Sequence, residues 1–184
     1  MGAIKVHEFT TVDGVFDAPM WTVDHGFPDD LAAAIGALTA SSSGILLGRT
    51  TFEMFAPAWS SRTVEDDPGA PFFNDTTKYV VSSTLSDAES VWRNSQVLGG
   101  YDADRIRALK DEVDGDLYVS GSATLVRALL ADGLVDELHL FVYPLATGTG
   151  IRLFPEGAPQ KLSLGGAATL SNGVAHLTYE PSAS

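Results

Sequence analysis

Three short segments rich in glycine and hydroxyl side chains each follow a stretch with the pattern of a strand, and their chemistry suits phosphate binding. They are Gly48-Arg49-Thr50-Thr51, Ser82-Ser83-Thr84 and Gly121-Ser122-Ala123-Thr124. In open α/β sheets, ligands bind beyond the carboxyl ends of strands, where helix N-termini present free N–H groups. Glycine lets the backbone approach a phosphate closely, and the Arg49 guanidinium can neutralise one. The three segments together favour a dinucleotide site, although glycine and serine also form ordinary turns and helix caps.

The sequence lacks the motifs of several other enzyme classes. Gly121 is not followed by the later glycines of a dinucleotide fingerprint, and Gly148-Thr149-Gly150 leads to Pro155 rather than into a helix, which disfavours a standard Rossmann enzyme. The sequence contains no phosphate loop, no nucleophile elbow and no zinc-binding His-Glu-x-x-His helix. Interpretations of the chain as a kinase, a serine hydrolase or a zinc peptidase are therefore excluded. The four histidines are dispersed along the chain, so we expect no metal site.

Composition narrows the possible partners and the compartment. A length of 184 residues predicts one domain, residues 1–184. The net charge of -13 disfavours general attraction to nucleic acid or to an anionic membrane. An anionic ligand therefore needs a local binding site with positively polarised groups. The absence of cysteine excludes disulfides and thiolate chemistry. Neither a signal peptide nor a stretch of ~20 apolar residues is present, and we therefore expect a cytoplasmic protein.

The elements that position the three segments follow from hydrophobic periodicity. Strands are predicted at residues 4–9, 44–48, 78–82, 95–98, 116–120, 137–143, 161–170 and 174–179. Helices are predicted at residues 28–39, 49–55, 102–113 and 124–131. A long apolar loop precedes the first helix, and residues 56–75 are expected to form an exposed connection. Strand and helix alternate before the last strands follow without helices, which predicts an α/β fold with a mainly parallel mixed sheet and antiparallel strands at one edge.

Five motifs, in this order, resemble those of the stand-alone dihydrofolate-reductase-like proteins related to the C-terminal reductase domain of bacterial riboflavin biosynthesis enzymes. They are Thr11-Val12-Asp13-Gly14, the Ile45–Glu53 stretch, Lys78–Ser83, Tyr118–Leu125, and Gly133–Leu138 continuing to Pro144 and to Gly148–Phe154. The resemblance covers nearly the whole chain. It implies a three-layer dihydrofolate-reductase-like fold, NADPH lying across the strand ends, and a homodimer. The deaminase domain of the bifunctional riboflavin enzymes is absent, so the resemblance does not extend to their exact pathway role.

The resemblance also implies roles for individual residues. The cofactor phosphates would lie at Gly48, Arg49, Thr50 and Thr51, the adenosine side at Ser82 and Ser83, and the pyrophosphate at Gly121, Ser122, Ala123, Thr124 and Leu125. Residues 12–16 would form a mobile loop beside the nicotinamide. Folate reductases place an arginine where this chain has Thr124, so a charge-assisted phosphate contact is missing unless Arg49 or Arg93 replaces it.

The candidate acid and the candidate substrate walls lie between the first strand and the first helix. Asp30, in Pro28-Asp29-Asp30-Leu31 after Trp21, matches the acid that helps protonate the pterin in folate reductases, although the spacing from Trp21 is longer here. Acids at a helix start also simply favour the helix dipole. Phe16, Trp21 and Phe27 are candidate walls for a flat ring, although aromatic residues are also common in cores.

These observations predict an NADPH-dependent reductase of a small heterocycle, with hydride supplied by the nicotinamide and a proton by an acid or an ordered water. A riboflavin-pathway aminopyrimidine and another pterin are both open as substrates. The alternative of another class is a nucleotide-binding or sensor protein that has kept the site without turnover. A second copy of the chain is the expected protein partner, with strand 137–143 and the terminal hairpin as pairing edges.

Overall fold

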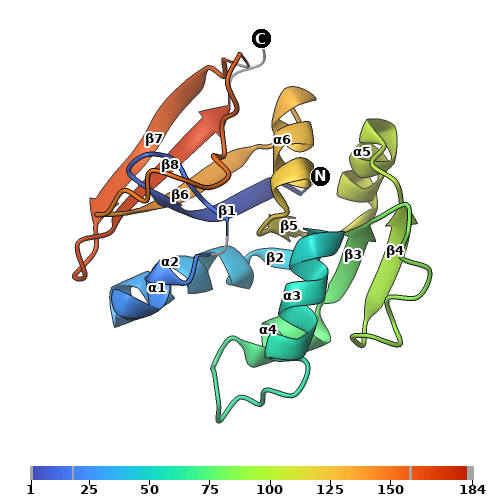
Figure 1. The fold of residues 1–184 in the computed structure, drawn as a ribbon. Helices are drawn as coiled ribbons and strands as arrows, with labels where there is room; N and C mark the ends of the chain where they lie inside the picture. The colour runs from blue at the N-terminus through green and yellow to red at the C-terminus, as the bar shows by residue number, and fades with distance from the viewer. Residues whose placement is uncertain (1, 18, 158, 182–184) are drawn as a thin grey trace.

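One eight-stranded sheet organises the chain, in the order β4-β3-β2-β5-β1-β6-β8-β7 (Figure 1). The computed structural model describes residues 2–17, 19–157 and 159–181. The strands are β1 (Ile4–Thr11), β2 (Ser42–Gly48), β3 (Thr77–Val81), β4 (Ser95–Gly99), β5 (Asp116–Val119), β6 (Glu137–Tyr143), β7 (Leu162–Thr169) and β8 (Ala175–Pro181). The first six run parallel, whereas β8 is antiparallel to both β6 and β7. The predicted mainly parallel sheet with antiparallel strands at one edge is confirmed.

Helices cover both faces of the sheet, which gives three layers (Figure 1). The helices are α1 (Trp21–Asp24), α2 (Asp29–Ala40), α3 (Arg49–Trp59), α4 (Ala70–Asp75), α5 (Ala103–Glu112) and α6 (Ala123–Ala131). α5 and α6 pack on one face, and α2, α3 and α4 on the other. Leu46 of β2 joins the core under α5 and α6, while its neighbours Ile45 and Leu47 join the core under α3. This two-sided burial explains the continuous apolar run of β2.

The prediction of an exposed connection at residues 56–75 is confirmed between the two helices, where residues 60–66 are exposed. It is wrong at both ends, because α3 continues to Trp59 and α4 occupies Ala70–Asp75. Tertiary contacts stabilise this region. The Trp59 ring stacks on Phe73 with 4.1 Å between ring centroids, and the Asn74 side chain donates to the Trp59 carbonyl at 2.9 Å. These contacts join residues about 15 positions apart, so local composition did not reveal them. The long apolar loop likewise contains the short helix α1.

The prediction that strand 137–143 is a sheet edge is wrong. β6 lies between β1 and β8, and β7 is the edge strand beyond β8. β7 carries no charged residue in Leu162–Thr169, and an uncharged edge strand favours pairing with another chain. The expected homodimer stays a prediction, with β7 rather than β6 as the strand that a second copy would extend.

The sheet also brings together histidines that are dispersed in the sequence. His139 of β6 and His176 of β8 lie 3.1 Å apart between Nδ1 and Nε2, and His7 of β1 is paired in register with His139. Their separation along the chain therefore did not predict their proximity. Among the described helices, none has the length and apolar character needed to cross a membrane.

Candidate functional site

The turns that follow β2 and β5 pack directly against each other. The Gly48 N–H donates to the Gly121 carbonyl at 3.4 Å. A Cβ atom on Gly48 would overlap the Ser122 side chain, and one on Gly121 would overlap Oγ1 of Thr51. Gly121 has a φ of 75°, which is left-handed backbone that favours glycine, and the Gly121–Ser122 peptide bond is cis. The close approach of the two turns therefore depends on glycine at both positions.

Two helix N-termini open at these turns without a side-chain cap. α3 follows Gly48 and α6 follows Ser122, and neither residue accepts a hydrogen bond through its side chain at the cap position. α5 differs, because the Asp102 carboxylate accepts from the N–H groups of Asp104 and Arg105. The first N–H groups of a helix have no partner within the helix and carry its positive dipole end. The N-termini of α3 and α6 are therefore suited to bind an anion, whereas the N-terminus of α5 is already occupied by the Asp102 carboxylate.

The third turn, after β3, is joined to the first by Arg49. Arg49 Nη1 donates to Thr84 Oγ1 at 2.5 Å, and Ser82 Oγ accepts from the Thr84 N–H at 3.2 Å. Arg49 Nε also donates to Glu53 at 2.7 Å, in an ion pair whose two side chains are each nearly half exposed. Such exposed pairs contribute only ~0–1 kcal/mol, so the Arg49 guanidinium can be recruited by a phosphate at little cost.

The structure thus brings most of the predicted cofactor residues to the carboxyl ends of β2, β3 and β5. Those joined by the contacts above are Gly48, Arg49, Thr51, Ser82, Gly121 and Ser122. Ser83 packs beside Gly100 at the end of β4, and Thr50 and Thr124 are exposed in the first turns of α3 and α6.

Two predicted contributors are placed differently from the rest. The Leu125 side chain is buried in the core, so this residue can offer only its backbone N–H to a ligand. Arg93 pairs with Asp75 at 2.7 Å and precedes β4. It therefore lies at the amino end of the strands, opposite the three turns, and Arg49 is the arginine that stands at them.

The three candidate aromatic walls do not form one group. Phe16 is buried in the core on the α6 side of the sheet, and 61% of Phe27 is exposed. Trp21 of α1 packs edge-on against Tyr143 of β6, with ring centroids 4.9 Å apart. Trp21 therefore stands over the other face of the sheet from Phe16. Residues 12–16 are tied to the segment after β6, since the Asp13 carboxylate accepts from the Gly148 N–H at 2.8 Å.

Asp30 is bound to the terminal hairpin. Its Oδ2 accepts from the Ser171 N–H at 2.6 Å, and its Oδ1 accepts from the Ser171 hydroxyl at 3.0 Å. The Ser171 N–H is the main cause that holds the pKa of Asp30 below its usual value. A general acid that works near neutral pH needs a raised pKa instead. Asp30 as the proton donor stays a prediction from the sequence resemblance alone, and its contacts favour a structural role at the start of α2 instead.

Glu8 is a site residue that the sequence analysis missed. It is 6% exposed on β1, and its Oε1 accepts from the Gly121 N–H at 2.8 Å. Burial raises the pKa of Glu8 to about 8, and the hydrogen bond from Gly121 opposes this shift only in part. One signal could have revealed it, because Glu8 places an acid in a strand whose neighbours are mainly apolar or β-branched.

His7 and Tyr118 form a second buried polar contact near this turn, on the opposite face of the sheet from Glu8. His7 Nδ1 lies 2.8 Å from the Tyr118 hydroxyl. Burial is the main cause that lowers the pKa of His7 to about 3, and burial also raises the pKa of Tyr118. Both side chains are therefore neutral near pH 7, and neither adds a charge beside Glu8.

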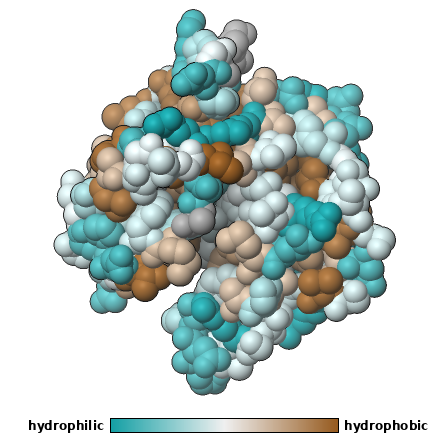
Figure 2. Space-filling model, in the orientation of Figure 1, coloured by the Kyte–Doolittle hydropathy of each residue, from teal (hydrophilic) through white to brown (hydrophobic). Residues whose placement is uncertain are grey.

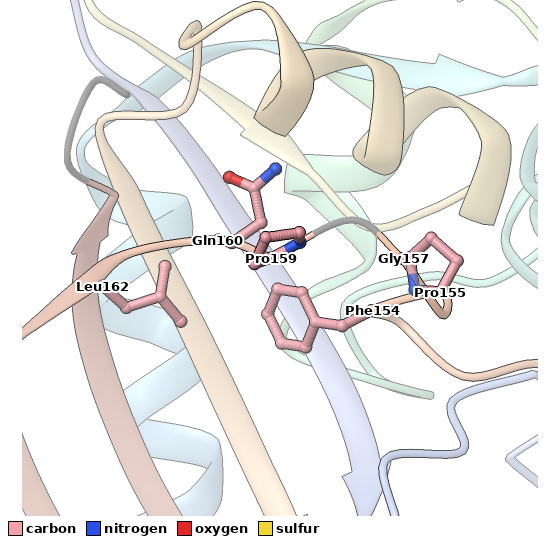
Figure 3. Close-up of a pocket in the computed structure, with 6 residues that line it drawn as sticks. All are labelled: Phe154, Pro155, Gly157, Pro159, Gln160 and Leu162. Carbon is pink, nitrogen blue, oxygen red and sulfur yellow. The ribbon is translucent and has the colours of Figure 1, made fainter.

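A cavity of about 400 Å³ lies away from the three turns. Its lining residues are Phe154, Pro155, Gly157, Pro159, Gln160 and Leu162, along the segment that leads into β7 (Figure 3). None of the predicted cofactor residues lines it. We therefore assign the candidate site to the turns, where buried polar groups and uncapped helix ends converge, and not to this cavity.

Comparisons with known proteins agree with this architecture. The chain superposes on a protein of Shewanella sp. PV-4, whose name assigns it to riboflavin biosynthesis, with a TM-score of 0.80 and 19% identity over 98% of this chain and 99% of that one. It superposes on dihydrofolate reductase of Enterococcus faecalis, solved with NADP(H), with a TM-score of 0.62 and 16% identity over 99% and 98% of the two chains. The uncharacterized protein YyaP of Bacillus subtilis (strain 168) is 26% identical over 141 residues, 73% of this chain and 72% of that protein.

The fold is therefore dihydrofolate-reductase-like, as the sequence motifs predicted. The family model described as the RibD C-terminal domain matches residues 3–176, which include every strand from β1 to β7 and the three turns. The resemblance drawn from the sequence is confirmed, and the chain belongs to the RibD C-terminal domain family.

Proposed function

We propose that this chain is a reductase that uses NADPH to reduce a small heterocycle of the pterin or aminopyrimidine type. The observation that carries the proposal is the meeting of the turns after β2, β3 and β5, with two uncapped helix N-termini among them. This arrangement supplies a local cradle for phosphate in a chain whose net charge is -13. Membership of a family of reductase domains supports the same activity.

The residues present fit a pyridine dinucleotide. Gly48 and Gly121 let the turns after β2 and β5 pack together, which brings the starts of α3 and α6 close to each other. The first N–H groups of both helices would donate to the oxygens of a diphosphate. Arg49 would bind a further phosphate, and Ser82 and Ser83 would contact the adenosine side. When bound, the reduced nicotinamide supplies a hydride. The chain holds the reactants together, excludes water, and lets an acid or an ordered water deliver the proton.

A planar substrate would lie near α1 and α2. On the face drawn in Figure 2, the surface is hollowed between the part formed by α1 and α2 and the part formed by α3 and α4. Trp21, packed against Tyr143, is the predicted aromatic wall whose contacts support a stacking role. The hollow would then admit a flat ring beside the proposed cofactor site.

A second candidate function is nucleotide binding without turnover, as in a sensor. The contacts of Asp30 favour this alternative, because both of its carboxylate oxygens are engaged by Ser171 and its pKa is lowered. An enzyme would then need another source for the proton. The two functions share the cofactor site and differ in catalysis.

Titration with NADPH, NADH and FMN, followed by tryptophan fluorescence, tests the proposed function. We expect NADPH to quench the fluorescence with saturation and FMN to have no saturable effect. A panel of pterins, aminopyrimidines and quinones then tests turnover through NADPH oxidation. Oxidation with one of the first two classes supports the reductase. Tight NADPH binding with no oxidation across the panel supports the sensor, and no saturable NADPH binding contradicts both.

Asp30→Asn separates a structural role of this acid from a catalytic one. We expect the free energy of unfolding to fall by about 1 kcal/mol, because an amide cannot accept both hydrogen bonds from Ser171 equally well. We expect NADPH affinity and turnover to stay within about twofold of the wild type, a difference of about 0.4 kcal/mol. Chemical denaturation and NADPH oxidation are the measurements. A large loss of turnover with unchanged affinity would instead make Asp30 catalytic.

Arg49→Met tests the proposed phosphate contact. We expect NADPH binding to weaken about tenfold, or about 1.4 kcal/mol, while NADH binding changes much less, because only NADPH carries the additional phosphate. Stability should be nearly unchanged, since the Arg49–Glu53 pair is exposed. Arg107→Met is the matched control, because Arg107 forms a similar exposed pair with Asp104 on α5. Equal losses of affinity for NADPH and NADH would show that Arg49 does not contact the additional phosphate of NADPH.

A further inference from the structure

Glu8 reaches across the point where two neighbouring strands part. The register pairs β1 with β5 from Ile4–Leu117 to Val6–Val119, whereas β1 stays paired with β6 as far as Thr11–Tyr143. Two residues beyond Val6, the Glu8 carboxyl group accepts the Gly121 N–H at 2.8 Å. It therefore occupies one of the N–H groups of the same turn that, one residue later, leads into the uncapped N-terminus of α6.

A buried carboxylate at this place opposes a second anion. Glu8 is 6% exposed, so water screens its charge poorly, and like charges repel strongly where the dielectric is low. Burial raises the pKa of Glu8 to about 8, which leaves the group mainly neutral at pH 7 and mainly ionised at pH 9. A neutral carboxyl group still accepts the Gly121 N–H through its carbonyl oxygen and adds no charge.

The other ionisable groups near the turn keep their charge across this range. Tyr118 on β5 interacts electrostatically with Glu8, and its pKa is raised, so its hydroxyl stays neutral. His7 on β1 has a pKa lowered to about 3 and also stays neutral, while Arg49 on α3 stays charged. Lys78, whose pKa burial lowers to about 8, does change its charge in this range. However, it lies near the amino end of β3, at the opposite end of the strands from the turn, where it is bound to the carbonyls of residues 73, 74 and 76. Glu8 is thus the group at this turn whose charge changes.

We propose that Glu8 couples anion binding to a proton, so that a phosphate group of the ligand binds at the β5–α6 turn only while the Glu8 carboxyl group is neutral. When ionised, Glu8 acts as an internal anion that competes with the ligand for the positive end of α6. The identification of the ligand as NADPH rests on the proposed function, but the coupling applies to any diphosphate at this turn. By linkage, ligand binding must also raise the protonation of Glu8.

The expected effect is a loss of affinity at alkaline pH that depends on this one side chain. With a pKa of about 8, the competent fraction is roughly nine tenths at pH 7 and one eleventh at pH 9, so the apparent Kd for NADPH should rise about tenfold between them. Glu8→Gln keeps an acceptor for the Gly121 N–H and removes the ionisation. Its Kd should change less than about twofold over the same range and should be lower than that of the wild type at pH 9.

The experiment measures binding of NADPH and of inorganic pyrophosphate at pH 7, 8 and 9 by calorimetry, with wild type, Glu8→Gln and Glu180→Gln. Glu180 is exposed on β8, so the Glu180→Gln variant should behave as the wild type. The wild type is also titrated at pH 8 in buffers of different ionisation enthalpy. About half a proton should be taken up per NADPH bound. The buffer series uses only the wild type, so its result does not depend on whether the Glu8→Gln variant folds.

The outcomes separate the proton coupling from the proposed function. Glu8-dependent pH sensitivity with both probes supports both. The same sensitivity with pyrophosphate but no NADPH binding supports the coupling and contradicts the reductase. Equal pH dependence in wild type and Glu8→Gln, or no proton uptake on binding, overturns the coupling while leaving NADPH binding intact. Failure of both probes to bind the wild type overturns the coupling as well, because the turn would then hold no anion.

Discussion

Gly48→Ala is expected to weaken NADPH binding by at least about tenfold, or about 1.4 kcal/mol. The new Cβ would overlap the hydroxyl oxygen of Ser122. It would also lie only 3.0 Å from both Cβ and the backbone nitrogen of Ser122. Rotation of the Ser122 hydroxyl relieves only the first of these contacts, so the turn before α6 must move away from β2. That movement separates the two uncapped helix ends. Overpacking of this kind costs about 1–3 kcal/mol, and the free energy of unfolding should fall by a similar amount.

Gly36→Ala is the matched control for this change. Gly36 is exposed in α2 and a Cβ there would have nothing within 4 Å. Alanine should therefore stabilise the helix by about 0.5–1 kcal/mol and leave NADPH binding unchanged. Calorimetric titration and chemical denaturation of both variants give the comparison. If Gly48→Ala folds and binds NADPH as tightly as Gly36→Ala, the diphosphate does not depend on the contact between the turns.

Lys78→Met is expected to lower the free energy of unfolding by about 3 kcal/mol or more. Lys78 is fully buried, and its ammonium group donates to the carbonyls of Phe73 at 2.8 Å, Asn74 at 3.3 Å and Thr76 at 2.8 Å. These carbonyls end α4, and methionine would leave them without that donor. The ammonium also lies 4.6 Å from the centre of the Trp92 ring. The loss should spread to α4 and to its contact with α3.

Lys161→Met provides the comparison, because Lys161 is exposed just before β7. It should change stability by no more than about 0.5 kcal/mol. Denaturant unfolding measures both variants, and hydrogen exchange of the α4 amides tests where the loss begins. Equal stability of the two variants would mean that the three carbonyls find other donors, and that Lys78 does not hold α4.

Elements whose signals are local were predictable from the sequence. β2 followed from an apolar run between glycines, and the terminal hairpin followed from Asn172-Gly173. α4 was missed because contacts that hold it come from α3, namely the stacking of Trp59 on Phe73 and the hydrogen bond from Asn74 to the Trp59 carbonyl. Composition alone made residues 56–75 look like an exposed connection. The same limit applied to β6, because its place between β1 and β8 depends on pairing order.

The residues of the candidate site likewise fall into those with a local sequence signal and those whose role depends on contacts between distant segments. The turn residues were predicted because glycine and hydroxyl side chains after a strand have a local meaning. Glu8 was missed because its partner, Gly121, is 113 residues away, and its burial depends on where β1 and β5 part. Asp30 was singled out by a local pattern, yet its hydrogen bonds lead to Ser171 in the distant hairpin. Such contacts between distant segments require the folded chain.

The most direct test of the cofactor site is a 1H–15N NMR titration of the assigned protein with NADPH. We expect the largest shifts at the backbone amides of Gly48, Arg49, Ser122 and Ala123, beside the proposed phosphates, and at Ser82, on the proposed adenosine side. The amides of Phe154 and Leu162, beside the cavity near β7, should be unaffected. Saturable shifts confined to that cavity, or no saturable shifts at the three turns, would contradict the account.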